Sequence, residues 1–331
     1  RAHGTLGKIR HDRAVDYTSD MLVNLNKVLP KAHRGGYAVP AFNINNLEVC
    51  QAVMDAAEEL QSPVILQTSE GALEYAGMEN LAAIARIAAK NASVPVVFHL
   101  DHGKNEKLVR EAIRSGLYTS VMFDGSLLPF KQNIARTRTI VKLAHARKMS
   151  VEAELGPIAG TEDLVSVRER EAFFTDPAQA EQFVKETGCD ALAVSIGTAH
   201  GAYKGPAKLD LKRLAEIGKR VHIPLVLHGA SGIDKKWLDR LHAECAKLGD
   251  CDRLAGAHGI PLAEEKKAIK LGIAKINIDS DLRIAFTASV REALLQEPHE
   301  FDPRKILGPA RAAMTELAKE KIRAFGSSGK W

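Results

Sequence analysis

Three of the chain's 12 histidines follow apolar segments of the kind that form buried β-strands: His102, His200 and His228. Imidazole nitrogens bind Zn²⁺ well, and a catalytic zinc keeps three protein ligands and one open position. No short spacing joins these histidines, so they form one site only if the fold brings three strand ends together. In that case they predict a catalytic zinc site.

Other predicted strands also end in side chains that can bind substrate or move protons. These residues are Asn43, Gln67, Ser69, Asp101, Asp124, Glu154, Asn277 and Asp279. Asp101 directly precedes His102, which places a carboxylate for acid–base chemistry beside the metal. The alternative is that Asp101 only orients a ligating histidine.

Two residues share side-chain parity with these strand ends. His99 stands two residues before Asp101, and we expect it to be a hydrogen-bonded interior residue. Lys275 stands two residues before Asn277 and is the one candidate for a Schiff-base lysine. The favoured alternative is that Lys275 pairs with a buried acid.

Glycines beside two of the histidines indicate phosphate binding. The segments HGAYKG (200–205) and HGASG (228–232) each place a glycine after a histidine, so backbone N–H groups can approach an anion. The segment NIDSDLR (277–283) adds a polar strand end that runs into a helix start. Together they predict an anion site next to the metal.

Eight apolar segments predict the strands that position these residues. Their ranges are 38–44, 63–68, 94–100, 119–124, 150–155, 191–196, 223–228 and 274–279. Amphipathic helical patterns fill nearly every gap, which predicts a parallel sheet covered by helices. Eight units favour a (β/α)8 TIM barrel with extra helices, whose active site lies at the carboxyl ends of the strands. An open doubly wound sheet is the alternative, but no GxGxxG motif follows the first strand.

We expect one domain over residues 21–331, preceded by a leader, tag or extension at 1–20. A first helix is predicted over 21–35 and a last one over 303–326. Residues 156–175 and 233–263 exceed the strand–helix repeat. The first predicts a long loop, of the kind that often serves as a lid, and the second an inserted helix and loop.

Composition excludes several classes of protein. The net charge of +5 is spread along the chain, so nothing supports nucleic-acid binding. The chain contains no run of 18 apolar residues, so the sequence predicts no membrane span. The four cysteines lack a CxxC pair, as expected of a reduced cytoplasmic protein. A second metal site is a minor alternative whose spacings fit no zinc finger: His242, Cys245, Cys251 and His258.

An ordered set of motifs resembles the class II fructose-bisphosphate aldolases, specifically their shorter bacterial type. The motifs are PAFNINNLE, HLDHG, VEAELG followed by ED, GTAHGAYKG, LHGASG, KINIDSDLRIAFT and FDPRKILGPAR, and they run over nearly the whole chain. The resemblance implies reversible cleavage of fructose 1,6-bisphosphate in glycolysis and gluconeogenesis. Tagatose bisphosphate is the alternative substrate.

The resemblance also implies roles for individual residues. His102, His200 and His228 would hold Zn²⁺, with Glu154 and Asp124 near an alternative metal position. Asp101 would handle the C4 hydroxyl proton, and Glu162 the proton on dihydroxyacetone phosphate. The C1 phosphate and a monovalent cation, Na⁺ or K⁺, would lie beside Gly201, Lys204, Gly229, Ser231, Asp279 and Ser280.

Further substrate contacts are implied at both ends of the chain. Asn43, Ser69 and Asn277 would contact substrate, while Arg283 and Arg304 would hold the C6 phosphate. Arg304 would reach in from a neighbouring subunit of a homodimer or homotetramer. Asp302 matches a residue tied to preference for fructose over tagatose bisphosphate. Ala159 stands where many relatives have glycine.

Overall fold

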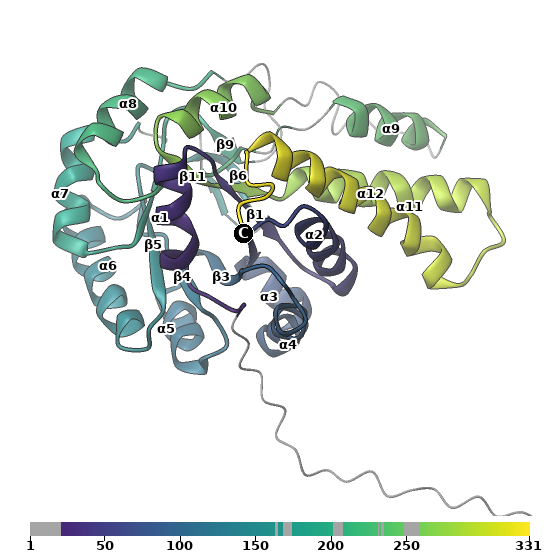
Figure 1. Cartoon of the computed structure of the whole chain (residues 1–331), viewed down its shortest axis with the longest axis horizontal. Helices are drawn as coiled ribbons and strands as arrows, with labels where there is room; N and C mark the ends of the chain where they lie inside the picture. The colour runs from purple at the N-terminus through teal and green to yellow at the C-terminus, as the bar shows by residue number, and fades with distance from the viewer. Residues whose placement is uncertain are drawn as a thin grey trace, which may run out of the picture.

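Eight parallel strands close into a barrel in the computed structural model, which describes residues 21–162, 165–167, 174–200, 208–230, 232, 235–247 and 259–331. Around the barrel the strands follow the order β1, β11, β10, β8, β5, β4, β3, β2. Figure 1 shows the barrel with the helices around it. The strand bounds are β1 Val39–Asn43, β2 Val64–Thr68, β3 Val96–Gly103, β4 Ser120–Phe123, β5 Ser150–Leu155, β8 Ala191–Val194, β10 Leu225–Leu227 and β11 Ile273–Ile278. All eight predicted strands and the predicted TIM barrel are confirmed, and the open sheet is wrong.

Helices surround the barrel and bury their apolar faces against the outer side of the strands. The surrounding helices are α2 Leu47–Glu59, α3 Glu70–Ala76, α4 Met78–Lys90, α5 Glu106–Ser115, α6 Phe130–His145, α7 Pro177–Thr187, α8 Leu211–Arg220 and α10 Leu262–Lys270. Several begin at a side-chain cap next to a strand end. Asn46 accepts from the backbone N–H of Val49, and Asn105 from that of Leu108.

Helix α1, Leu25–Gly35, closes one end of the barrel. Its buried Leu25 and Leu29 pack with inward-facing residues such as Val97 and Val226. The helix begins four residues later than predicted, because Met21 and Val23 hydrogen-bond to the backbone of Val96 on β3. Apolar side chains fill the barrel at the amino-terminal ends of the strands. The functional site is therefore expected at the opposite end, where the strands end in polar residues.

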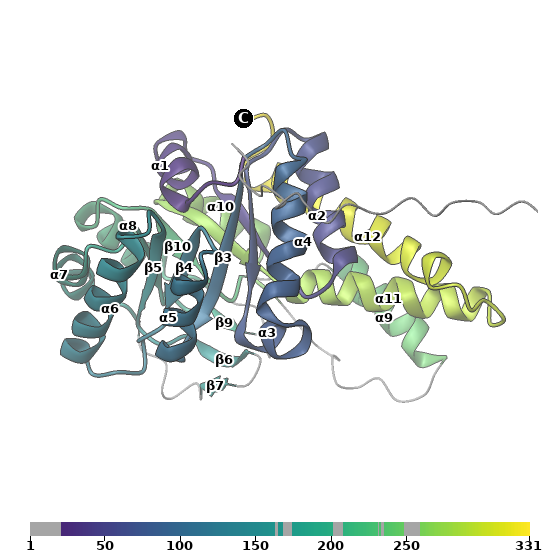
Figure 2. The ribbon, with the colours of Figure 1, turned by 90° about the horizontal axis from the view of Figure 1, so that it is seen from below.

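Three helices form an arm beside the barrel: α9 Lys235–Ala246, α11 Ser280–Gln296 and α12 Pro303–Ala324. Helix α11 packs against α9 and α12, and α12 also packs against α2. Figures 1 and 2 show the arm extending away from the strands, with the turn between α11 and α12 at its far end. The predicted inserted helix after the seventh strand is α9.

The segment predicted as a long loop after the fifth strand contains two short strands, so that prediction was incomplete. Strand β6, Ala159–Glu162, pairs antiparallel with β7, Val165–Val167, and parallel with β9, Ala199–His200. The pairing of β6 with β9 joins segments far apart in sequence, which local patterns do not reveal. Within the described residues, no helix is long and apolar enough to cross a membrane.

Candidate active site

Strand β3 carries the two residues at the centre of the site. Asp101 and His102 are both buried, and β3 runs three residues past its predicted end to include them. His102 has a φ of +43°, a left-handed conformation that is uncommon for residues other than glycine. Such conformations cost free energy and are often found at functional sites. Gly103 is required next, because a Cβ there would lie 2.5 Å from the carbonyl oxygen of Met122. The backbone packing at the end of β3 therefore leaves no room for a side chain at position 103.

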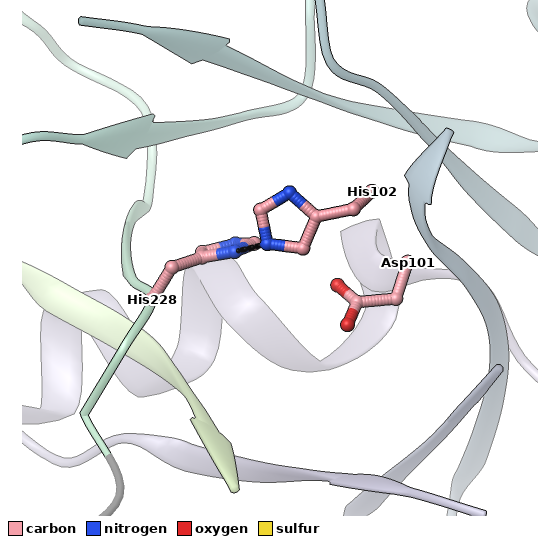
Figure 3. A group of neighbouring side chains, drawn as sticks. All are labelled: Asp101, His102 and His228. Atoms are coloured by element: carbon pink, nitrogen blue, oxygen red, sulfur yellow. Dashed lines mark hydrogen bonds between the residues drawn. The ribbon is translucent and has the colours of Figure 1, made fainter. Parts of the chain in front are cut away.

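The imidazoles of His102 and His228 point at each other across the barrel mouth. Figure 3 shows the two rings and the Asp101 carboxylate facing a common point. The ring centroids are 4.3 Å apart at 88°, and Nε2 of His102 contacts Nδ1 of His228 directly. Ligand atoms of Asp101, His102 and His228 lie within 4.8 Å of one another, so the three could hold a metal ion.

The environment of His228 favours the neutral imidazole that a metal needs. Burial, followed by the charges of His102 and Lys275, lowers the pKa of His228 well below its usual 6.5. Its Nε2 lies 2.6 Å from Oε1 of Glu152. An N–H at Nε2 donated to that carboxylate leaves the lone pair of Nδ1 facing His102.

A second group of possible ligands lies on the other side of His102. Nδ1 of His102 is 3.1 Å from Oδ2 of Asp124 and 3.7 Å from Oε2 of Glu154, and all three residues are buried. Burial alone would raise the pKa of Asp124, but the hydrogen bond and charge of His102 outweigh it and lower that pKa. The predicted alternative metal position therefore has a suitable set of donors.

Three side-chain amides surround the Asp101 carboxylate. Nδ2 of Asn43 and Nε2 of Gln67 each donate to Oδ2 at 3.0 Å, and Nδ2 of Asn277 donates to Oδ1 at 3.0 Å. Burial would raise the pKa of Asp101, but the charges of His102 and Lys275 prevail and lower it. Asp101 is therefore a fixed, ionised carboxylate that can accept a proton beside the histidine pair.

A cavity of about 650 Å³ opens beside this cluster, between α2, α3 and α11. Asn43 lines both the cavity and the Asp101 cluster, and Asp279 and Arg283 also line the cavity. Nε of Arg283 lies 2.7 Å from Oδ1 of Asp279. Ser280 begins α11, and Ser69 caps α3 by accepting from Ala72. Polar groups thus continue from Asp101 into a space large enough for a small organic ligand.

Other predicted residues lie outside this cluster or outside what the structure describes. The structure gives only the backbone of His200 and Glu162, on β9 and β6, and Gly201, Lys204 and Ser231 fall outside the described residues. Gly229 directly follows His228 with a left-handed φ of +60°. Asp302 and Arg304 pair with each other at 2.7 Å at the start of α12. That helix start stands at the far end of the arm.

Three buried residues below the mouth show the limits of sequence reasoning. His99 is an interior residue bonded to Ser120, as predicted, and Lys275 pairs with Glu152. Sequence reasoning missed Glu152, although it stands two residues before Glu154 and shares its parity. The minor second metal site remains untested, because Cys251 and His258 lie outside the described residues.

Fold and site together define a parallel-barrel protein with buried histidines and carboxylates that could hold a metal at the mouth. The family model of class-II fructose-bisphosphate aldolase matches residues 23–330. The chain therefore belongs to this family.

Individual relatives agree. The chain is 50% identical to a fructose-bisphosphate aldolase of Thermus caldophilus, over 94% of this chain and all of the relative. It is 43% identical to one from Helicobacter pylori, with the same coverage. The crystal structure of the YdjI aldolase from Escherichia coli K12 matches with a TM-score of 0.75 and 34% identity, over 94% of this chain and 99% of that one.

Proposed function

We propose that this chain cleaves fructose 1,6-bisphosphate reversibly to dihydroxyacetone phosphate and glyceraldehyde 3-phosphate. One observation carries the proposal: the amide-bound Asp101 carboxylate lies beside the facing nitrogens of His102 and His228. Family membership and the names of the relatives support the substrate. His102, His200 and His228 would hold Zn²⁺, with Asp124 and Glu154 at an alternative position.

The residues of the site divide the chemistry between them. Aldol cleavage must remove the C4 hydroxyl proton and stabilise an enediolate, and bound zinc supplies positive charge for the second task. Asp101 accepts the hydroxyl proton, and Asn43, Gln67 and Asn277 fix the direction of its oxygens. Glu162 exchanges the proton on the carbon of dihydroxyacetone phosphate.

The cavity and the helix start beside it suit a phosphorylated substrate. The C1 phosphate and a Na⁺ or K⁺ ion would lie among Gly201, Lys204, Gly229, Ser231, Asp279 and Ser280. Asn43, Ser69 and Asn277 would contact the sugar, and Arg283 and a partner's Arg304 the C6 phosphate. Asp302 favours fructose over tagatose. We further propose a homodimer or homotetramer that works in the cytoplasm, consistent with unpaired, buried Cys50 and Cys189.

Cleavage assays with and without a chelator test the function. We expect fructose 1,6-bisphosphate to be cleaved faster than tagatose 1,6-bisphosphate. Activity should disappear with chelator and return with zinc. Activity that survives chelation and is blocked by borohydride would instead indicate a Schiff base on Lys275. Absence of cleavage with zinc present would refute the proposal.

A further inference from the structure

Lys275 is completely buried beneath the active site, and its ammonium group joins two polar side chains. Nζ lies 2.9 Å from Oε2 of Glu152 and donates to Oδ1 of Asn277 at 2.7 Å. A buried lysine charge is costly unless it is paired and hydrogen-bonded. Both partners of Lys275 in turn contact residues of the proposed reaction centre.

The contact with Asn277 fixes the orientation of its amide. An amide oxygen that accepts from an ammonium group leaves the NH₂ end to face the other way. That NH₂ group donates to Oδ1 of Asp101 at 3.0 Å. Without the Lys275 donor, the Asn277 amide would be anchored to Asp101 only through its NH₂ end, so its alignment with the carboxylate would be less fixed.

The contact with Glu152 acts on the opposite side of the site. Oε1 of Glu152 lies 2.6 Å from Nε2 of His228, and Oε2 is 3.4 Å from Nε2 of His99. Because Lys275 holds Oε2, the other oxygen of Glu152 is directed at His228 and can accept the N–H at Nε2. This selects the ring nitrogen that remains available to a metal, namely Nδ1.

We propose that Lys275 is a positioning residue that aligns, through one ammonium group, the Asn277 amide with Asp101 and the Glu152 carboxylate with His228. This inference rests on the proposed function. It requires that Lys275 affect turnover through Asn277 and metal affinity through Glu152, as two separable effects.

Two double-mutant cycles on the zinc-loaded enzyme separate these effects. In the first, Lys275→Met should lower kcat by about 10-fold or more with a smaller change in KM. In an Asn277→Ala background, Lys275→Met should lower kcat by less than about 3-fold, because the aligned amide is already absent.

In the second cycle, zinc affinity is measured by competition with a chelator. Lys275→Met should weaken zinc binding about 10- to 100-fold, as loss of outer hydrogen-bond partners does. The effect should shrink to a few-fold in a Glu152→Gln background. Exposed Lys270 on α10 provides the matched control, and Lys270→Met should change neither quantity.

A charge-neutral variant covers the case in which Lys275→Met does not fold. Lys275→Met with Glu152→Gln leaves no unpaired buried charge. If Lys275 only neutralises Glu152, this double variant has the kcat of Glu152→Gln alone, and the inference is wrong. A kcat well below that of Glu152→Gln supports it. The inference is also wrong if Lys275→Met lowers kcat and zinc affinity by the same factors in the Asn277→Ala and Glu152→Gln backgrounds as in wild type. An inactive wild-type enzyme would instead refute the proposed function.

Discussion

Asp101 illustrates how the site uses a carboxylate that is both buried and charged. Burial opposes its charge, but three amide donors and nearby cationic groups maintain it. A base held in this way needs no rearrangement to accept a proton, so electrostatic preorganisation replaces solvation by water. The same three amides explain why Asp101 is directed to one point beside His102 and His228.

Replacing Asp101 by alanine should therefore abolish most turnover and leave the metal site occupied. We expect kcat to fall about 10²- to 10⁴-fold, the range for loss of a general acid–base group. Zinc content, measured by atomic absorption after dialysis, should stay close to that of wild type. A variant with normal kcat would show that Asp101 only orients a histidine.

Gly103 shows the constraint that packing places on the same strand. Its φ is not left-handed, so space and not conformation requires glycine there. Gly103→Ala would press a methyl group against the Met122 carbonyl and Val109, and we expect a loss of about 1–3 kcal/mol in the free energy of unfolding.

Gly36 provides the comparison for Gly103. Nothing lies within 4 Å of its virtual Cβ, and only a φ of +64° opposes a side chain. Gly36→Ala should cost about 1 kcal/mol, the conformational penalty alone. Urea unfolding of both variants measures the difference, and equal losses would contradict the packing argument.

At the scale of the elements, the sequence predicts the barrel because each strand is an apolar segment with a polar end. In β3, the alternation of side chains along the strand predicts that His99 and Asp101 lie on the same face, with His102 at the strand end. Chain-distant pairings are harder, since β6 and β9 are too short to carry a periodic signal. The role of Glu152 was missed for another reason. It contacts both Lys275 and His228, which come from strands that only closure of the barrel brings together.

Helix α10 contains an ionisable group that makes stability depend on pH. Glu265 is fully buried, and neither of its carboxylate oxygens has a hydrogen-bond partner among the residues that the structure describes. Burial raises its pKa from 4.5 to about 7, although Lys321 opposes the shift. Between these values the folded state binds more protons than the unfolded state. Its contribution to stability is thus complete below 4.5 and is lost as the pH rises through about 7.

Glu265→Gln should remove this loss, because glutamine resembles the protonated acid. We expect the variant to match wild type near pH 4 and to exceed its free energy of unfolding by about 1–3 kcal/mol at pH 8. Denaturant titrations at both pH values test this. Glu264→Gln, at the less buried neighbouring position, is the control and should show no such difference. A constant offset between Glu265→Gln and wild type would argue against a shifted Glu265.

At the scale of the whole molecule, the arm of α9, α11 and α12 extends away from the barrel. It carries polar residues that the resemblance assigns to substrate binding. The Arg304 side chain is 89% exposed, and in the described part of the chain its ion-pair partner is Asp302, two residues away. Arg283, on the same arm, lines the cavity of its own chain. Under the proposed function, in which both arginines hold the C6 phosphate, we expect two chains to build the site, with Arg304 of one chain entering the cavity of the other.

Mixing two defective variants tests this arrangement. Asp101→Ala lacks the base, and Arg304→Ala should raise KM for fructose 1,6-bisphosphate. In a mixed dimer, the Arg304→Ala chain keeps its own Asp101 and receives Arg304 from the Asp101→Ala chain, so one of the two sites is intact. Random exchange makes about half of the dimers mixed, so about a quarter of wild-type activity at low substrate should return.

The control for this experiment is a chain that carries both substitutions. Mixed with Asp101→Ala, it supplies no chain that has its own Asp101, so no site regains the base and no activity should return. Subunit exchange is followed independently, by native mass spectrometry of chains with different tags. Exchange without recovery in the first mixture would place Arg304 outside the neighbouring site. Recovery to about a quarter shows that each catalytic site is built from two chains, because two sites complete within their own chains cannot repair each other.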